Sequence, residues 1–294
     1  MQGLLLVNKP KGITSFKAVA TIKRLANEKR VGHTGTLDPI ATGVLPIFIG
    51  RATTLSSLLL DADKSYTASV KLGVTTDTLD ITGEVLSTAT PNVSLDELNS
   101  TINSFLGESE QTPPMYSAIK KDGVRLYELA RKGEEVEVEK RKIKIYKIEL
   151  LSFLDDEFSF TVTCSKGTYI RSLIRDIGEK LGCGATMTEL TRNATSGFDL
   201  SECISLEDLT AENIENYILP EEKAVLHLRE VNVTEKQAVR FSNGGKLGFD
   251  RLKVSDFSKN ELVRIKYQGL LIGLGIAETE NQEIAIKCII NPYK

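Results

Sequence analysis

The sequence predicts an α+β protein, in which a mixed core of strands and helices is followed by a small β-rich part. Residues 158–164 alternate apolar and polar side chains like a half-buried strand, and residues 170–181 repeat apolar side chains at helical spacing. A second helical repeat covers residues 95–106. After about Ser242 only short alternating runs remain, separated by glycine and polar turns, which is typical of a compact β-rich unit.

Local signals predict the first elements. Residues 4–7 form a short apolar run that predicts a strand, and residues 66–72 alternate like another strand. Between them, Ser15 is the expected N-cap of a helix. The stretch RVGHTGTLDPIATGVLP, residues 30–46, then follows as a loop. The apolar face of the expected helix consists of Val19, Ile22, Leu25 and Ala26.

The next helix is marked by its ends. Ser94 and Glu97 fit a capping box, and Gly107 is the expected stop. The segment QTPPMYSAIKKDG, residues 111–123, follows it. Its prolines exclude regular structure from the first half of that segment.

The helix expected at residues 170–181 carries two arginines near its start. Helical spacing places Arg171 and Arg175 on one outward face, after a turn formed by SKGT. Because the helix dipole disfavours a cation at a helix N-terminus, we expect Arg171 to pair with an anion. An acidic region between Glu202 and Glu222 then predicts helix up to about Leu219.

Composition limits the class of protein. The chain has 294 residues, of which 41% are hydrophobic and 26% charged, as in a globular protein of about two domains. No apolar run is long enough to span a membrane, so the expected location is the cytoplasm. The four cysteines form no CxxC pair, which favours buried apolar residues over a zinc site or a disulfide framework.

Charge is unevenly distributed along this chain, whose net charge is −3. Residues 9–30 hold seven basic residues and a single acid, Glu28, and residues 120–147 hold a second basic stretch with acids interleaved. Either cluster alone is explained equally well by a solvated helix face. The two together favour a polyanionic partner held at a local site.

The loop at residues 30–46 contains a single carboxylate, Asp38, directly before Pro39. A metal site needs several convergent ligands, and this loop offers only His33 and Asp38. A glycosidase normally needs two carboxylates, and a serine or cysteine hydrolase needs a nucleophile motif that the chain lacks. A lone rigid aspartate suits a nucleophile or a charge that stabilises a cationic centre. The structural alternative is an aspartate that organises an Asx turn.

Five stretches resemble the TruB family of bacterial tRNA pseudouridine-55 synthases in order and spacing. They are GLLLVNKPKGITSF, RVGHTGTLDPIATGVLPIFIGRATTL, KSYTASVKLGVTTDTLDITGE, QTPPMYSAIKKDGVRLYELARKG and CSKGTYIRSLIRDIGEKLG. The resemblance implies a pseudouridine synthase fold, in which helices flank a mixed, mainly antiparallel sheet, over residues 1–228. It also implies a small PUA-like RNA-binding domain over residues 229–294, where the match is weaker.

The resemblance also assigns catalytic roles. Asp38 matches the aspartate that attacks the target nucleotide, either at C6 of the base or at C1′ of the ribose. Tyr66 matches the tyrosine implicated in stacking on the base and in proton handling. Arg171 matches the arginine that pairs with the catalytic carboxylate.

Other matches imply RNA contacts. His33 matches the histidine that helps to extract the target base, and Lys9 and Tyr169 match residues near the active site. The segment near residues 112–147 matches the family's RNA-gripping insertion. Its basic residues include Lys140, Arg141 and Lys142.

The sequence therefore predicts an enzyme that isomerises uridine 55 in the T loop of tRNA without a cofactor or a metal. The expected protein is a monomer that binds the T-stem loop and no membrane. Two alternatives remain open. A non-catalytic RNA-binding or folding module would not need Asp38, Tyr66 and Arg171 together, and a synthase in a guide-RNA particle would need a guide RNA and protein partners.

Overall fold

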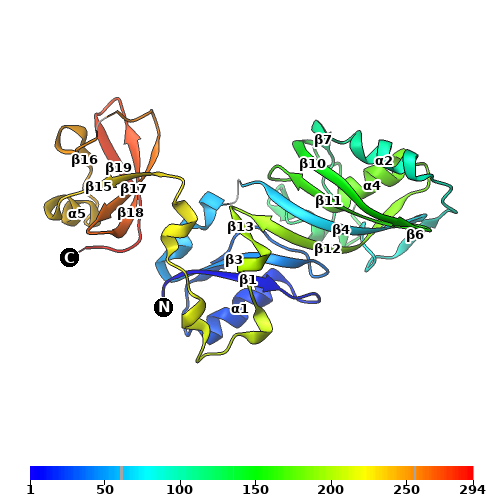
Figure 1. Cartoon of the computed structure of the whole chain (residues 1–294), viewed down its shortest axis with the longest axis horizontal. Coiled ribbons are helices and arrows are strands. Elements are labelled where there is room, and N and C mark those ends of the chain that lie inside the picture. The colour runs from blue at the N-terminus through cyan, green and yellow to red at the C-terminus, as the bar shows by residue number, and fades with distance from the viewer. Residues whose placement is uncertain (60–61, 135, 255, 294) are drawn as a thin grey trace.

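The computed structural model describes residues 1–59, 62–134, 136–254 and 256–293. Residue 135 of the predicted insertion and residues 255 and 294 of the predicted C-terminal domain therefore lie outside the described residues. Figure 1 shows one large sheet flanked by helices, with a smaller sheet near the C-terminus at one end of the molecule. This arrangement confirms the predicted α+β fold class.

The large sheet has ten strands in the described ranges, in the order β14-β1-β3-β12-β4-β11-β10-β7, with β2 beside β3 and β13 beside β12. Pairing is parallel between β1 and β14 and between β3 and β12, and antiparallel at the other junctions. The sheet is thus mixed and mainly antiparallel. Its strands are β1 (Gly3–Lys9), β2 (Val31–His33), β3 (Thr42–Ile49), β4 (Lys64–Leu72), β7 (Gly107–Gln111), β10 (Arg141–Leu154), β11 (Glu157–Cys164), β12 (Ala185–Thr195), β13 (Phe198–Asp199) and β14 (Ile204–Ser205).

Helices cover one face of this sheet. Alternate residues of β4 and β11 are buried and join the core formed with the helices, whereas the residues between them are mostly half-exposed serines and threonines. The helices of this core are α1 (Ser15–Leu25), α2 (Leu95–Asn103) and α4 (Ile170–Lys180). The catalytic candidate Tyr66 lies on the buried, helix-covered face of β4.

Two small two-stranded sheets of the described residues are separate from the large sheet. β5 (Val74–Thr76) pairs with β6 (Val85–Thr88), and β8 (Lys120–Lys121) pairs with β9 (Val124–Arg125). The short helix α3 (Leu126–Ala130) follows β9 within the predicted insertion.

The C-terminal sheet has five strands in the described ranges, in the order β15-β17-β18-β19-β16, and packs with helix α5 (Glu235–Ser242) around its own core. A separate apolar cluster joins Leu271, Leu274 and Ile290 to side chains of β1 and β3. The two sheets are therefore held together by apolar packing. The strands are β15 (Arg229–Asn232), β16 (Leu247–Gly248), β17 (Leu262–Tyr267), β18 (Leu270–Glu278) and β19 (Glu283–Ile289). The division after residue 228 stays a prediction.

Several local expectations were wrong. Thr14, not Ser15, caps α1 by accepting a hydrogen bond from the amide of Lys17. Helix α2 ends at Asn103, before Gly107, which instead opens β7 with a positive φ of 96°. The stretch of residues 30–46 is irregular only between β2 and β3, because its two ends pair as strands.

The acidic region forms no α-helix in the structure. It consists of short 3-10 helices η2 (Leu200–Glu202), η3 (Leu206–Asp208), η4 (Ile214–Tyr217) and η5 (Glu221–Val225). Two further 3-10 helices are η1 (Gly50–Leu59) and η6 (Phe249–Arg251). The four cysteines, all within the described ranges, are free thiols, but only Cys164 is fully buried.

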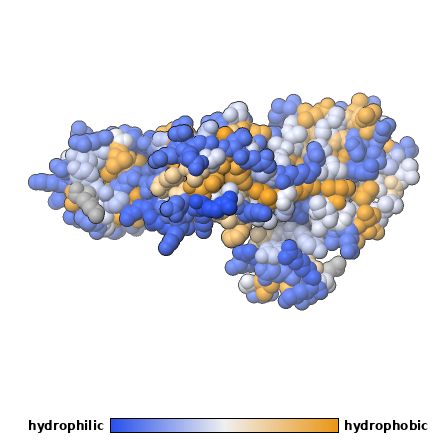
Figure 2. All heavy atoms as spheres, turned by 90° about the horizontal axis from the view of Figure 1, so that it is seen from below, coloured by the Kyte–Doolittle hydropathy of each residue, from blue (hydrophilic) through white to orange (hydrophobic). Residues whose placement is uncertain are grey.

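Figure 2 shows that hydrophilic side chains cover much of the surface at the C-terminal end, with hydrophobic side chains interspersed elsewhere. Scattered apolar residues are normal on a protein surface. None of the helices in the described parts of the chain combines the length and the apolar character that a membrane crossing requires.

Candidate active site

The loop that carries Asp38 is held from the side of helix α1. The Ser15 hydroxyl accepts a hydrogen bond from the Leu37 amide at 2.8 Å and donates one to the Leu37 carbonyl at 3.0 Å. The Gly12 amide donates to the Pro39 carbonyl at 2.8 Å. These bonds fix the residues on both sides of Asp38. Ser15 therefore holds this loop in place rather than capping α1.

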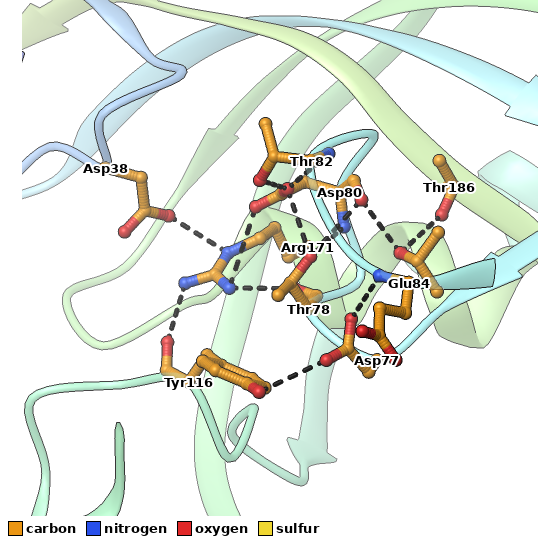
Figure 3. A network of polar contacts seen from close by, with 10 residues as sticks. Asp38, Asp77, Thr78, Asp80, Thr82, Glu84, Tyr116, Arg171 and Thr186 are labelled. Atoms are coloured by element: carbon orange, nitrogen blue, oxygen red, sulfur yellow. Dashed lines mark hydrogen bonds and ion pairs between the residues drawn. The ribbon is translucent and has the colours of Figure 1, made fainter. Parts of the chain in front are cut away.

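Arg171 faces Asp38 from the first turn of α4. Its Nε lies 2.9 Å from Oδ2 of Asp38, while Nη1 donates to the Thr78 carbonyl at 2.8 Å and Nη2 to the Tyr116 carbonyl at 2.9 Å (Figure 3). The Arg171 side chain is only 6% exposed, so the expectation of an outward-facing arginine was wrong. Arg175 does lie nearer the surface, at 25% exposure, and pairs with Asp176. Thus α4 buries Arg171 because its guanidinium finds three oxygen partners.

A polar turn between β5 and β6 supplies a second acid. Asp80 is buried, and its Oδ2 lies 3.9 Å from Nη1 of Arg171. Its Oδ1 accepts hydrogen bonds from the amide of Thr82 at 3.0 Å and from the hydroxyl of Thr78 at 3.1 Å. Asp80 was not among the residues predicted from the sequence. The only available signal was the density of acids and threonines in TTDTLDITGE.

The electrostatic balance at Asp38 suits a nucleophile. Partial removal from water raises the pKa of the Asp38 carboxyl above its ordinary value, Arg171 opposes the rise, and Asp80 adds to it. The side chain nevertheless keeps 35% of its surface exposed. A more basic carboxylate that a substrate can still reach is better suited to attack than a fully buried one.

Tyr66 and Arg192 lie side by side on neighbouring strands. They are register partners on β4 and β12, and both are buried. Burial raises the pKa of Tyr66, while the charge and hydrogen bonding of the Arg192 guanidinium oppose the rise. The phenol therefore stays neutral at neutral pH. The charge of Asp38 also acts on Tyr66, so the two catalytic candidates belong to one site.

Arg192 is a site residue that the sequence analysis missed. It is fully buried, its Nε donates to the Val44 carbonyl at 2.8 Å, and its Nη2 donates to the Gly35 carbonyl at 2.8 Å. These two carbonyls lie on either side of Asp38 in the chain. Arg192 therefore clamps the ends of the loop. No sequence signal separated this arginine from an ordinary strand residue.

Lys9 supports the same loop from β1. It is fully buried, and its Nζ donates to the carbonyls of Pro10 and Ile13, both at 2.8 Å, and to that of Pro39 at 3.5 Å. Burial lowers the pKa of Lys9 from 10.5 to about 8, and the negative charge of Asp38 opposes this shift. Lys9 thus acts on the loop mainly through backbone contacts.

His33 ends β2, just before the loop. Its Nδ1 is buried, without a hydrogen-bond partner among the described residues, although the side chain is half-exposed overall. Burial lowers the pKa of His33, and the charge of Arg192 lowers it further. The imidazole is therefore neutral at neutral pH and offers shape and hydrogen bonds rather than charge.

Of the remaining candidates, Tyr169 and Arg141 lie together at the N-terminus of α4. Gln111 binds the backbone of Tyr169 at both its amide, at 2.9 Å, and its carbonyl, at 3.1 Å. The Arg141 guanidinium lies 5.5 Å from the centre of the Tyr169 ring. Lys140 and Arg141 also line a hollow of about 580 Å³ in the insertion. The alternation of β10 turns Lys142 toward the opposite face of the sheet from Arg141.

The donor set does not resemble a metal site. Among the described residues, no group of three or more histidine, cysteine, aspartate or glutamate side chains is placed to hold a metal ion. The structure thus brings together Asp38, Tyr66, Arg171 and Lys9 around one loop, with His33 at its start. It leaves Lys140, Arg141 and Lys142 at the insertion.

The chain is similar to known proteins over most of its length. The family model described as TruB family pseudouridylate synthase (N terminal domain) matches residues 23–170. The model described as tRNA pseudouridylate synthase B C-terminal domain matches residues 171–231. A Clostridium tetani protein named tRNA pseudouridine synthase B is 47% identical over 285 residues, covering 97% of this chain and 98% of that protein. A Clostridium perfringens protein of the same name is 47% identical over 278 residues, covering 94% of this chain and 95% of that protein.

Solved structures show the same architecture. One, described as a Cbf5-Nop10-Gar1 complex, matches with a TM-score of 0.77 and 30% identity over 99% of this chain and 85% of that one. Another, an H/ACA RNP bound to a substrate RNA containing 2′-deoxyuridine, matches with a TM-score of 0.75 and 28% identity, again over 99% of this chain and 85% of that one. From the site geometry and these matches together, the chain belongs to the TruB family of pseudouridylate synthases.

Proposed function

We propose that this protein converts a uridine of tRNA to pseudouridine, at position 55 in the T loop, with Asp38 as the nucleophile. The observation that carries the proposal is the contact of 2.9 Å between Asp38 and the buried Arg171. A loop anchored by Ser15 and Arg192 presents this carboxylate, which is partly exposed and has a raised pKa. The curated relatives named tRNA pseudouridine synthase B support the choice of substrate.

The reaction is an isomerisation, so its atoms and electrons balance within one nucleotide. The Asp38 carboxylate attacks either C6 of the uracil or C1′ of the ribose. The bond between N1 and C1′ breaks, the base turns, C5 bonds to C1′, and the bond to Asp38 breaks, which restores the carboxylate. C5 then loses its hydrogen as a proton, and N1 gains a proton. There is no net oxidation or hydrolysis, so the proposed reaction needs neither a redox cofactor nor an energy source.

Each neighbour of Asp38 has a role in this scheme. Arg171 binds Oδ2 and aims the carboxylate, while Oδ1 takes no part in that pair. Tyr66, a neutral phenol on β4, stacks on the base and handles a proton. His33 assists extraction of the uridine from the stacked T loop, a step that any attack on its glycosidic centre requires.

The proposed partner is the T-stem loop of tRNA, bound by a monomer without a metal ion, and we expect the protein to act in the cytoplasm. Phosphate contacts position such a substrate, and the shape of its loop specifies it. Lys140 and Arg141 of the insertion are the proposed phosphate contacts, whereas Lys142 faces the other side of β10. The C-terminal sheet, proposed as a PUA-like domain from residue 229 onward, adds a second RNA contact.

The test is release of tritium from tRNA labelled at C5 of uracil, incubated with purified protein in EDTA. We expect release by the wild type, none by Asp38→Asn, and normal release by the control Asp250→Asn, whose side chain is exposed in the C-terminal part. The Asp38→Asn variant should bind tRNA nearly as well as the wild type, since a carboxylate contributes no attraction to phosphate. A tRNA with cytidine at position 55 should release no tritium.

Three results would change the proposal. Absence of release by a wild type that binds tRNA tightly would favour the non-catalytic RNA-binding module. Release that depends on an added guide RNA and protein partners would favour a guide-RNA synthase. If the product carries pseudouridine at a different position, only the assignment of position 55 would be contradicted.

A further inference from the structure

We propose that Tyr116 is a positioning residue that transmits the placement of the basic insertion to the Asp38–Arg171 pair. The inference rests on the proposed function, because it concerns how the grip on RNA reaches the reacting carboxylate. It assigns to Tyr116 a role in aiming Asp38, separate from any contact with the substrate.

Tyr116 contacts the site at two points. Its backbone carbonyl accepts a hydrogen bond from Nη2 of Arg171 at 2.9 Å, and its hydroxyl donates to Oδ2 of Asp77 at 3.1 Å (Figure 3). The other carboxylate oxygen of Asp77 accepts from the amide of Glu84 at 2.8 Å. Tyr116 thus connects the catalytic arginine to the turn between β5 and β6.

The same segment is bonded to the basic part of the insertion. The amide of Tyr127 donates to the Ser117 carbonyl at 3.1 Å, and the amide of Leu126 donates to the Ile119 carbonyl at 2.8 Å. These bonds and helix α3 join residues 117–132 into one unit that begins directly after Tyr116. The basic residues of this part are Lys120, Lys121, Arg125, Arg131 and Lys132.

The start of the insertion is anchored to α4, so we expect a displacement of its basic part to change the position of Tyr116. Thr112 is held by the Ser172 hydroxyl, which donates to its carbonyl at 2.9 Å, and Gln111 is bound to the backbone of Tyr169. Both anchors lie at the N-terminal end of α4. A shift of the basic part is thereby transferred to the segment that follows Thr112, where Tyr116 meets Arg171.

Arg171 is suited to pass this displacement on. Its guanidinium is planar and holds the Thr78 carbonyl, the Tyr116 carbonyl and Asp38 at fixed angles. Because the side chain is only 6% exposed, water cannot easily replace a lost partner. A change in the position of the Tyr116 carbonyl therefore changes the direction in which Nε meets Asp38.

The first experiment is the substitution Tyr116→Phe, assayed by single-turnover tritium release at saturating enzyme. We expect the rate to fall about fivefold, as for loss of one hydrogen bond, with the tRNA dissociation constant unchanged. The matched control is Tyr293→Phe. It removes a tyrosine hydroxyl that donates to a carboxylate, Glu235, at 3.0 Å in the C-terminal part. The control should keep the wild-type rate.

A pH profile separates positioning from a general loss of structure. The charged groups that face Asp38 are Arg171 from α4, Asp80 from the turn and Lys9 from β1. Arg171 lowers the pKa of Asp38, so a loosened pair should raise that pKa. The acid limb of the rate profile should therefore move to higher pH in Tyr116→Phe and stay in place in Tyr293→Phe.

A double-mutant cycle with Asp77→Ala identifies the contact. The bond to the Glu84 amide is lost in both backgrounds and so cancels in the cycle. We expect the double variant to be no slower than Asp77→Ala alone, because that variant has already lost the bond to the Tyr116 hydroxyl. The two single variants also test the inference separately. If one of them is too unstable to assay, the other alone must show the slower rate and the acid limb moved to higher pH.

Two outcomes overturn the inference while leaving the proposed function in place. One is a Tyr116→Phe enzyme with the wild-type rate and acid limb, and the other is strict additivity with Asp77→Ala. Failure of the wild type to release tritium would instead contradict the proposed function.

Discussion

Replacing Arg171 by lysine tests the central pair while conserving its charge. The guanidinium makes three short contacts, to Asp38 at 2.9 Å, to the Thr78 carbonyl at 2.8 Å and to the Tyr116 carbonyl at 2.9 Å. An ammonium cannot reproduce this planar fork. We therefore expect that Arg171→Lys keeps a positive charge next to Asp38 but no longer orients the Asp38 carboxylate.

The size of the effect follows from those contacts. A hydrogen bond to a charged group contributes about 1.5–3 kcal/mol. Loss of the aimed bond to Asp38, at about 2 kcal/mol, corresponds to a rate about 30-fold lower, since each 1.36 kcal/mol is tenfold. If the lysine also pairs imperfectly with the Thr78 and Tyr116 carbonyls, the expected loss of rate extends to several hundredfold. Because Asp38 contacts no phosphate in the proposed scheme, the tRNA dissociation constant should change less than about threefold.

The assay is single-turnover tritium release alongside equilibrium tRNA binding, at a temperature well below the melting midpoint of the variant. The matched control is Arg175→Lys on the same helix, whose arginine is 25% exposed and pairs with its neighbour Asp176. It should stay within about threefold of the wild type, as expected for a partly exposed ion pair. Equal losses in rate and binding by Arg171→Lys would refute the pairing argument.

Three further predictions follow from the surroundings of the loop. Arg141→Gln should weaken tRNA binding and reduce by about one the slope of the logarithm of the tRNA binding constant against the logarithm of salt concentration. Lys142→Gln should change this slope less, because Lys142 lies on the other face of β10. Equal slopes in the two variants would contradict the assignment of RNA binding to the face that carries Arg141. Burial lowers the pKa of Lys9 from 10.5 to about 8, so the unfolded chain binds more protons in that window. The free energy of unfolding of the wild type should therefore rise from pH 8 to 10.5 relative to that of Lys9→Met, and parallel curves would refute this. Arg192→Met removes the side-chain donor from the buried Val44 carbonyl and the partly buried Gly35 carbonyl, and should cost about 2–4 kcal/mol in urea unfolding. A loss below about 1 kcal/mol would be the contrary result.

Periodicity alone located a strand of the core and the helix that carries Arg171. Residues 158–164 and 170–181 were predicted as strand and helix, and β11 and α4 occupy almost those ranges. The pattern was readable because both elements bury one face, which imposes a period of 2 on the strand and 3.6 on the helix. End signals were less reliable, since Thr14 rather than Ser15 caps α1. Neighbouring hydroxyl residues offer similar capping chemistry, and the choice depends on which of them the loop at Asp38 recruits.

The sequence by itself determined the α+β class, because apolar periodicity marks strands and helices. It also determined the family and the identity of the candidate nucleophile, Asp38, because five motifs occur in a fixed order. The tertiary structure decided the burial of Arg171, which helical spacing had placed on an outward face. It also decided the contributions of Asp80 and Arg192. Each of these depends on partners far away in the chain. Local patterns report only which face of an element is apolar. Sheet register and helix packing determine which oxygen meets a buried guanidinium, and those contacts form only when the whole chain has folded.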